Sequence, residues 1–145
     1  MNNDMIELIK LTMPEIDLKL SNKIIEKISD VQNISNSERE SIIHIMDTYM
    51  CSYDAIENFR KYIRVSYYKQ IDGKKYDRSL LLLAENLIKG KGDGRISEDD
   101  MKKLLKSSYD NNKITDCEKD TLHYICENFK CTDKAKKYLD MNISN

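Results

Sequence analysis

The 145-residue sequence is poor in the two residues that interrupt helices, because it contains only one proline and four glycines. Proline removes a backbone hydrogen-bond donor and glycine loses much conformational freedom on folding, so both weaken a helix interior. Long stretches of the chain are therefore free to form helices. The sequence also lacks any run close to the roughly 20 apolar residues that a membrane-spanning helix needs.

The N-terminal segment lacks the features of a secretory signal. It carries acidic residues early, and it has no apolar stretch followed by a small-residue cleavage site. We therefore expect an intracellular protein without a transmembrane segment, in which the thiols are reduced. The four cysteines contain no CxxC pair, the spacing found in many zinc and redox motifs.

An internal repeat is the clearest pattern that the sequence does contain. The segment from Ile34 to Ala55 aligns without gaps with the segment from Ile114 to Ala135. The offset between them is 80 residues (114 − 34 = 80), and we call this offset the repeat interval. Identical residues occur at five positions and conservative pairs lie between them, including Ser35 with Thr115. Two copies of one helical unit explain such a match better than a long array of repeats.

Four predicted helices begin in the same way, with an isoleucine followed by a capping residue. Ser, Thr and Asp at this position accept hydrogen bonds from free N–H groups of the first helical turn. Two of the four, Ser35 and Thr115, are followed three residues later by glutamate, which is the capping-box pattern. Each preceding isoleucine is expected to be buried as half of a hydrophobic staple. The four isoleucines are Ile16, Ile34, Ile96 and Ile114.

These patterns predict an all-α protein of about eight helices in two tandem, similar four-helix units with approximate internal twofold symmetry. The predicted divisions are residues 1–68 for the first unit, 69–77 for a basic junction and 78–145 for the second, packed as one globule. Asp72-Gly73 predicts a turn within the junction, and no segment alternates for long enough to predict a strand. The expected helices span about residues 3–12, 17–31, 36–50, 52–68, 78–89, 98–109, 116–129 and 133–141.

The segment KGDGRISEDD (residues 91–100) resembles part of an EF-hand calcium loop. Aligning Ile96 with the eighth position of the family's loop places Gly94 at the sixth, where the family has its glycine. The resemblance then implies oxygen ligands for a metal at Asp93, Ser97 and Asp100.

The family pattern is broken at the first and third loop positions, which are Lys89 and Lys91. A hard divalent cation takes six or more oxygen ligands, and two ammonium groups oppose it. We therefore predict no metal and no other cofactor at physiological concentrations. A capped helix start after a glycine-rich turn accounts for the same residues, and a degenerate EF-hand-like regulatory domain is an alternative.

No catalytic signature such as GxSxG or HExxH is present, so we predict no catalytic residues and a protein that is not an enzyme. Cys117, His123, Cys126 and Cys131 are residue types that bind zinc. On one helix, however, Cys117 and Cys126 are nine residues apart and face opposite sides. A zinc site is therefore not expected.

A basic island lies at residues 59–78, where seven bases outnumber two acids and four tyrosines are interleaved. Bases beside stackable aromatics suit an acidic protein surface, and they also suit a phosphate backbone. A solvated linker between the units is the third interpretation.

We predict from this island a helical interaction or adaptor module that binds a protein partner. A nucleic-acid-binding protein that uses the same segment is an alternative. The residues predicted to contact the partner are Arg60, Lys61, Arg64, Tyr67, Tyr68, Lys69, Lys74 and Lys75.

Overall fold

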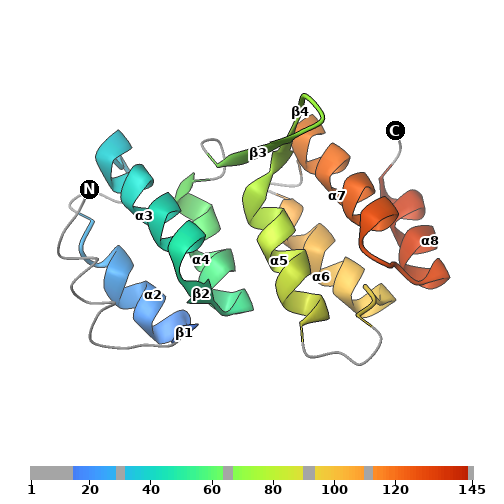
Figure 1. Ribbon diagram of the computed structural model, residues 1–145, viewed down its shortest axis with the longest axis horizontal. Coiled ribbons are helices and arrows are strands. Elements are labelled where there is room, and N and C mark those ends of the chain that lie inside the picture. Colours follow the sequence, from blue (N-terminus) through green and yellow to red (C-terminus); the bar gives the residue numbers. More distant parts are fainter. Residues whose placement is uncertain (1–14, 29–31, 64–66, 90–93, 110–112, 144–145) are drawn as a thin grey trace. The chain divides into compact units, whose positions relative to one another are not determined.

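The part of the chain that the computed structural model describes consists of residues 15–28, 32–63, 67–89, 94–109 and 113–143 (Figure 1). Within these residues the chain forms seven helices and four short strands, so the prediction of a mostly helical protein is confirmed. The helix predicted near residues 3–12 lies outside the described residues. The chain divides into two compact units, unit 1 (residues 1–67) and unit 2 (residues 68–145).

Unit 1 contains three helices and two short strands in its described part (Figure 1). These elements are β1 (Glu15–Ile16), α2 (Leu18–Ile25), α3 (Asn36–Thr48), β2 (Met50–Cys51) and α4 (Tyr53–Ile63). Helix α4 packs against both α2 and α3. Their apolar faces meet in a core that includes the fully buried side chains Ile24, Ile42, Ile45, Phe59 and Ile63.

The helices of unit 1 begin at the polar residues that the sequence identifies as caps. At the start of α2, Asp17 Oδ1 accepts the N–H of Leu20 at 2.8 Å. At the start of α3, Ser35 Oγ accepts the Glu38 N–H at 3.1 Å and Glu38 Oε1 accepts the Ser35 N–H at 3.3 Å. This capping box satisfies N–H groups that have no partner within the helix.

A short parallel pairing joins the start of α2 to the start of α4. Ile16 lies opposite Cys51 in the pair β1–β2, and the Ser52 N–H donates to the Ile16 carbonyl at 2.9 Å. Ile16 and Cys51 are both buried, so this pairing is part of the core of unit 1. The sequence did not predict it, because two-residue strands leave no alternating pattern.

Unit 2 contains a β-hairpin and four helices in its described part (Figure 1). These elements are β3 (Tyr68–Ile71), β4 (Lys74–Asp77), α5 (Arg78–Ile88), α6 (Glu98–Ser108), α7 (Asp116–Asn128) and α8 (Asp133–Asn142). Helix α6 packs against α5 and α8, and α5 also packs against α7. The fully buried core includes Leu80, Leu83, Ile96, Met101, Leu104, Leu122 and Ile125.

The basic junction predicted at residues 69–77 folds largely as a hairpin, so the expectation that the chain has no strand is wrong here. Strands β3 and β4 pair antiparallel, with Ile71 opposite Lys74. The two turn residues, Asp72 and Gly73, have positive φ angles of 51° and 81°. A type I′ turn requires positive φ at both central residues, and Asp-Gly is a preferred pair for it.

Unit 2 has its own parallel contact, between the segment that precedes α6 and the segment that precedes α8. Ile96 pairs with Cys131 in a parallel bridge. The Ile96 N–H donates to the Lys130 carbonyl at 2.9 Å, and the Thr132 N–H donates to the Ile96 carbonyl at 3.0 Å. Because Ile96 is fully buried, this contact fixes the beginning of α6 within the core of unit 2.

Some predicted details differ from the structure. Helix α2 ends at Ile25, where the sequence predicted helix to residue 31. Ile34 and Ile114, which were expected to be buried, are half-buried. Each directly precedes a helix cap, Ser35 or Thr115, which is itself exposed. No helix in the described part of the chain is long and apolar enough to cross a membrane.

Candidate functional site

The structure places the predicted partner-binding residues on both units. In unit 1, Arg60 and Tyr67 are buried, with 3% and 4% of their surface exposed. Tyr67 also hydrogen-bonds to the Asp47 carboxylate. A buried side chain does not reach a partner's surface, so these two residues drop out of the candidate site. Lys61 is exposed on α4, and Arg64 lies outside the described residues.

The other four predicted residues lie together on the β3–β4 hairpin, and we call them the hairpin surface: Tyr68, Lys69, Lys74 and Lys75. The three lysines are exposed and Tyr68 is 40% exposed. Lys75 Nζ lies 5.4 Å from the centre of the Tyr68 ring, within the range of a cation–π contact. Partial burial, together with nearby acidic groups, raises the pKa of the Tyr68 hydroxyl.

The hairpin is anchored at its base to α7. The Asp77 N–H donates to Thr121 Oγ1 at 2.8 Å, and Asp77 Oδ1 accepts the Ser79 hydroxyl at 2.6 Å. The rings of Tyr76 and Tyr124 lie 4.7 Å apart. Because Asp77 is buried and also caps α5, these bonds hold the hairpin in one position relative to α5 and α7.

The two long edges of the hairpin differ. On the β4 edge, side chains of α7 accept the Asp77 N–H and donate to the Lys75 carbonyl. On β3, the register turns the backbone groups of Tyr68 and Gln70 away from β4. No hydrogen-bond partner for these groups lies among the described residues. Unpaired groups on an edge strand can pair with a further strand.

Two residues of the segment that resembles an EF-hand loop form a helix cap. Ser97 Oγ accepts the Asp100 N–H at 3.1 Å, and Asp100 Oδ2 accepts the Ser97 N–H at 3.0 Å. This reciprocal pair is a capping box that begins α6. Asp93 lies outside the described residues, whereas Gly94 has a positive φ of 61°. The described part of the loop is therefore the start of a capped helix.

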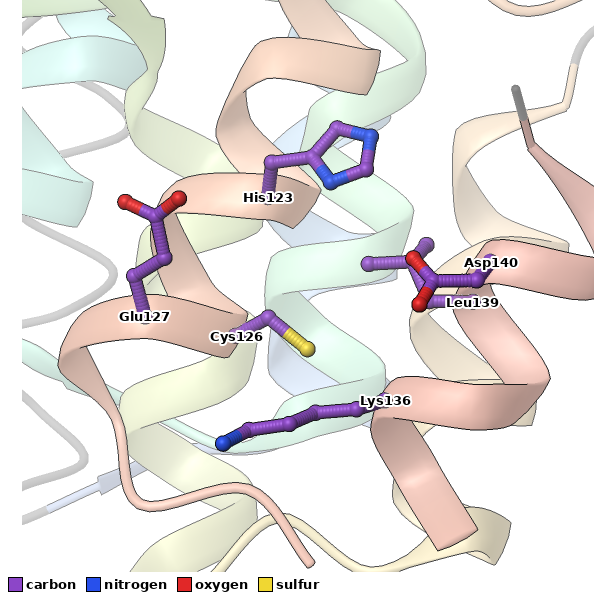
Figure 2. A pocket seen from close by; sticks show the side chains of 6 residues that line it. All are labelled: His123, Cys126, Glu127, Lys136, Leu139 and Asp140. Carbon is purple, nitrogen blue, oxygen red and sulfur yellow. The ribbon is translucent and has the colours of Figure 1, made fainter. Parts of the chain in front are cut away.

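A pocket of about 250 Å³ that is open to solvent lies between α7 and α8 in unit 2, and the sequence analysis missed it (Figure 2). We refer to this open pocket as the cavity. Figure 2 shows the Cys126 sulfur directed into the space between the two helices, with the Lys136 side chain running past it. His123 Nε2 is buried without a hydrogen-bond partner among the described residues. The cavity is lined by His123, Cys126, Glu127, Lys136, Leu139 and Asp140.

The four cysteines are free thiols in different surroundings. Burial raises the pKa of Cys51 to about 12, and burial also raises the pKa of Cys117. A hydrogen bond from Cys131 lowers the pKa of Cys126, with a smaller contribution from the positive charge of Lys136. The same hydrogen bond and burial raise the pKa of Cys131. Cys126 is therefore the most acidic of the four thiols.

Two sequence signals could have located the features that were missed. The turn pair Asp72-Gly73 is flanked by Tyr68 and Ile71 before it and by Tyr76 after it, which favours a hairpin. A hairpin centred on this turn makes residues 68–71 a strand, and the backbone groups of Gln70 then point away from the partner strand. A comparison of positions that differ by the repeat interval would have identified the cavity, because Lys136 occupies the position that corresponds to buried Ile56.

Among the residues that the structure describes, no group of three or more His, Cys, Asp or Glu side chains is arranged to hold a metal ion. Comparison of the whole chain with known protein families, with curated proteins and with solved structures finds no match.

Proposed function

We propose that this protein is a non-enzymatic binding module. The partner is a protein, and it presents an extended acidic segment to the β3–β4 hairpin of unit 2. The observation that supports this proposal most strongly is an exposed, positively charged hairpin that is anchored at its base to α7. An anchored element loses little conformational entropy when it binds, so more of the contact energy appears as affinity.

The charge of the hairpin surface favours an acidic partner. Lys74 lies 3.5 Å from Asp120, but both side chains are about half exposed and water weakens their attraction. Lys69 and Lys75 form no salt bridge with any described residue. Complementary charge increases the rate at which partners associate and makes binding sensitive to salt.

The free edge of β3 supports binding of an extended segment rather than a helix. The outward N–H and C=O groups of Tyr68 and Gln70 can pair with the backbone of an added strand. An acidic side chain on that strand can then reach Lys69, which lies on the same edge strand, or Lys75, which lies opposite Gln70. Backbone pairing supplies affinity in this mode, and the charged side chains supply selectivity.

The distribution of the side chains favours protein over nucleic acid. Lys69 and Lys74 lie on one face of the hairpin, whereas Lys75 lies on the other with Tyr68. Tyr76 is occupied in its contact with α7. Binding of single strands relies on a continuous basic groove with several free aromatic rings, and the hairpin offers one exposed ring.

Reversal of the three hairpin lysines tests the proposal. The probe is a short fluorescent peptide of alternating Glu and Val, titrated with the full-length protein and followed by anisotropy. We expect binding that weakens as salt increases and that is lost when Lys69, Lys74 and Lys75 are all changed to Glu. The matched control changes the exposed residues Lys103, Lys106 and Lys137 to Glu.

The control carries the same net charge as the hairpin variant, so it separates local contact from overall charge. Equal binding by the two triple variants would show that the hairpin is not the site. A single-stranded oligonucleotide that competes better than the acidic peptide would favour a nucleic-acid partner.

A proline substitution tests the edge-strand mode separately. Gln70→Pro removes an N–H that points away from β4, so the bonds between β3 and β4 are retained. We expect weaker peptide binding for Gln70→Pro and unchanged binding for Gln70→Ala. Equal binding by both variants would refute strand pairing, whereas it would remain consistent with the contacts between charged side chains.

We also infer that units 1 and 2 are copies of one helical module. In support, α6, α7 and α8 begin at residues 98, 116 and 133, whereas α2, α3 and α4 begin at residues 18, 36 and 53, so each pair of starts differs by the repeat interval. The parallel contacts Ile16–Cys51 and Ile96–Cys131 differ by the same interval. An experimental structure in which residues 16–59 fail to superpose on residues 96–139 would refute this inference.

A further inference from the structure

Two thiols lie next to each other where α7 ends and the chain turns into α8. Cys126 is on the last turn of α7, and Cys131 follows it after four intervening residues. Cys131 Sγ lies 3.7 Å from the carbonyl oxygen of Ile125, the residue that directly precedes Cys126. The turn after α7 therefore brings the Cys131 sulfur back to the backbone beside Cys126.

The cavity gives a small oxidant access to one of these sulfurs. Cys126 lines the cavity between α7 and α8, and its sulfur is directed into that space (Figure 2). The volume of about 250 Å³ is ample for a molecule as small as hydrogen peroxide. The corresponding positions of unit 1, one repeat interval earlier, hold apolar side chains that are buried: Met46, Ile56 and Phe59.

The groups around Cys126 favour its reactive form. The thiolate is the nucleophile in thiol oxidation, and neighbouring positive charge and hydrogen-bond donors increase its population. The Cys131 S–H and the Lys136 ammonium group provide these interactions, against the opposing charges of Asp140 and Glu127. The Cys126 thiolate is itself the first cause that raises the pKa of Cys131. Oxidation of Cys126 removes this cause, so Cys131 becomes the attacking sulfur only after Cys126 has been oxidised.

We propose that Cys126 and Cys131 form a peroxide-sensitive dithiol that closes reversibly to a disulfide beside the cavity. The Cys126 thiolate attacks one oxygen of hydrogen peroxide, the O–O bond breaks, and the departing hydroxide takes a proton to become water. The product is a sulfenic acid at Cys126. Cys131 sulfur then attacks Cys126 sulfur, the S–O bond breaks, and the departing hydroxide takes the Cys131 proton. Two thiols and one peroxide thus give one disulfide and two waters.

The disulfide would affect more than the turn in which it forms. Cys131 pairs with Ile96 at the start of α6, and Thr132 caps α8. A bond from Cys131 to Cys126 therefore links the end of α7 to the points where α6 and α8 begin. A thiol can return the pair to its reduced form by exchange, which makes the change reversible. This proposal is independent of partner binding by the hairpin.

Peptide mapping of the full-length protein tests the proposal. The reduced protein is treated with one equivalent of hydrogen peroxide, its remaining thiols are alkylated, and it is digested with trypsin without reduction. Cleavage after Lys119, Lys130 and Lys134 places Cys126 and Cys131 in two different peptides. We expect these two peptides to be joined, and to separate after reduction. Loss of thiols without this link, or links only between molecules, would overturn the proposal.

Variants distinguish the roles of the two sulfurs. Cys131→Ser is expected to stop at the sulfenic acid, which dimedone traps at Cys126, and Cys126→Ser is expected to lose the cross-link and leave Cys131 reduced. Cys117→Ser, the control, is expected to form the link as the unmodified protein does. Dimedone labelling of Cys117 in preference to Cys126 would contradict the assignment. The wild-type peptide map remains decisive even if a variant folds poorly.

Removal of the Lys136 charge tests whether this positive charge favours the thiolate form of Cys126. Lys136→Met should raise the pH at which Cys126 is half-alkylated and should slow its oxidation. Lys137→Met, on the exposed neighbouring position, should leave both unchanged. Equal behaviour of the two lysine variants would show that Lys136 does not activate Cys126.

Discussion

Units 1 and 2 differ in the space between their last two helices. In unit 1 this region contains Met46, Ile56 and Phe59, which are almost completely buried. The positions one repeat interval later are Cys126, Lys136 and Leu139, and a cavity is present there. Two of these positions thus change from buried apolar side chains to the half-buried Cys126 and the exposed Lys136, whereas Leu139 stays buried. The corresponding helices therefore enclose apolar side chains in unit 1 and line the cavity in unit 2.

The largest expected difference between the two regions is in thiol reactivity. Only the thiolate is alkylated, and its fraction falls about tenfold for each pH unit below the pKa. With the pKa of Cys51 raised to about 12 and that of Cys126 lowered from about 9, alkylation near pH 8 should be at least about a thousandfold faster at Cys126. Mass spectrometry after timed exposure to iodoacetamide measures both rates in one sample.

Because burial also excludes the reagent from Cys51, the control is the same experiment in concentrated urea. Unfolding should make the two rates equal. Similar rates in the folded protein would show that the two cysteines do not differ in environment.

Shortening a buried side chain between the last two helices should reduce the free energy of unfolding more in unit 1 than in unit 2. Phe59→Ala removes a fully buried ring and should lower the free energy of unfolding by about 3–5 kcal/mol. Leu139→Ala should lower it by about 2–3 kcal/mol, since Leu139 is also buried but is an aliphatic side chain at the wall of the cavity rather than an aromatic ring in a filled core. Urea unfolding followed by circular dichroism gives both values.

The reverse substitution sharpens this test. Leu139→Phe places the unit 1 residue in unit 2, where the cavity can accept part of the ring. Stability should be little changed, whereas a loss of several kcal/mol would mean that the cavity is not available to the side chain.

The smallest expected effect concerns a feature that the two units share. Ser35 Oγ and Thr115 Oγ1 each accept the N–H of a glutamate three residues later at 3.1 Å. Ser35→Ala and Thr115→Ala should therefore each lower the free energy of unfolding by about 1 kcal/mol. A loss in only one unit would show that the caps are not equivalent. Glycine at the same positions should lower it by only a few tenths of a kcal/mol.

Local features were predictable from the sequence. The starts of α3, α6 and α7 follow Ser35, Ser97 and Thr115, because a capping residue and the first turn are close in sequence. The extent of the helices from α5 to α8 also agrees with the prediction to within about two residues. The repeat interval could also be found from the sequence alone, because similar residues recur at a constant spacing along the chain.

Features that depend on tertiary packing were not predictable. Arg60 and Tyr67 lie in a basic, tyrosine-rich segment, yet both side chains are buried. Their charge and polarity gave no sign of this, because burial depends on which elements pack around a residue. The cavity likewise depends on how α7 and α8 face each other, and Cys126 and Lys136 are ten residues apart in sequence.

The parallel contacts also influence the order in which each unit assembles. Ile16 and Cys51 are 35 residues apart, as are Ile96 and Cys131 (51 − 16 and 131 − 96). Closing a loop of this length costs about 3 kcal/mol of chain entropy, which a two-residue contact cannot offset alone. The contacts should therefore form late in folding, after the helices have packed. The amides of Ser52 and Thr132 donate to the isoleucine carbonyls, so hydrogen exchange at these two sites would time the opening of each unit separately.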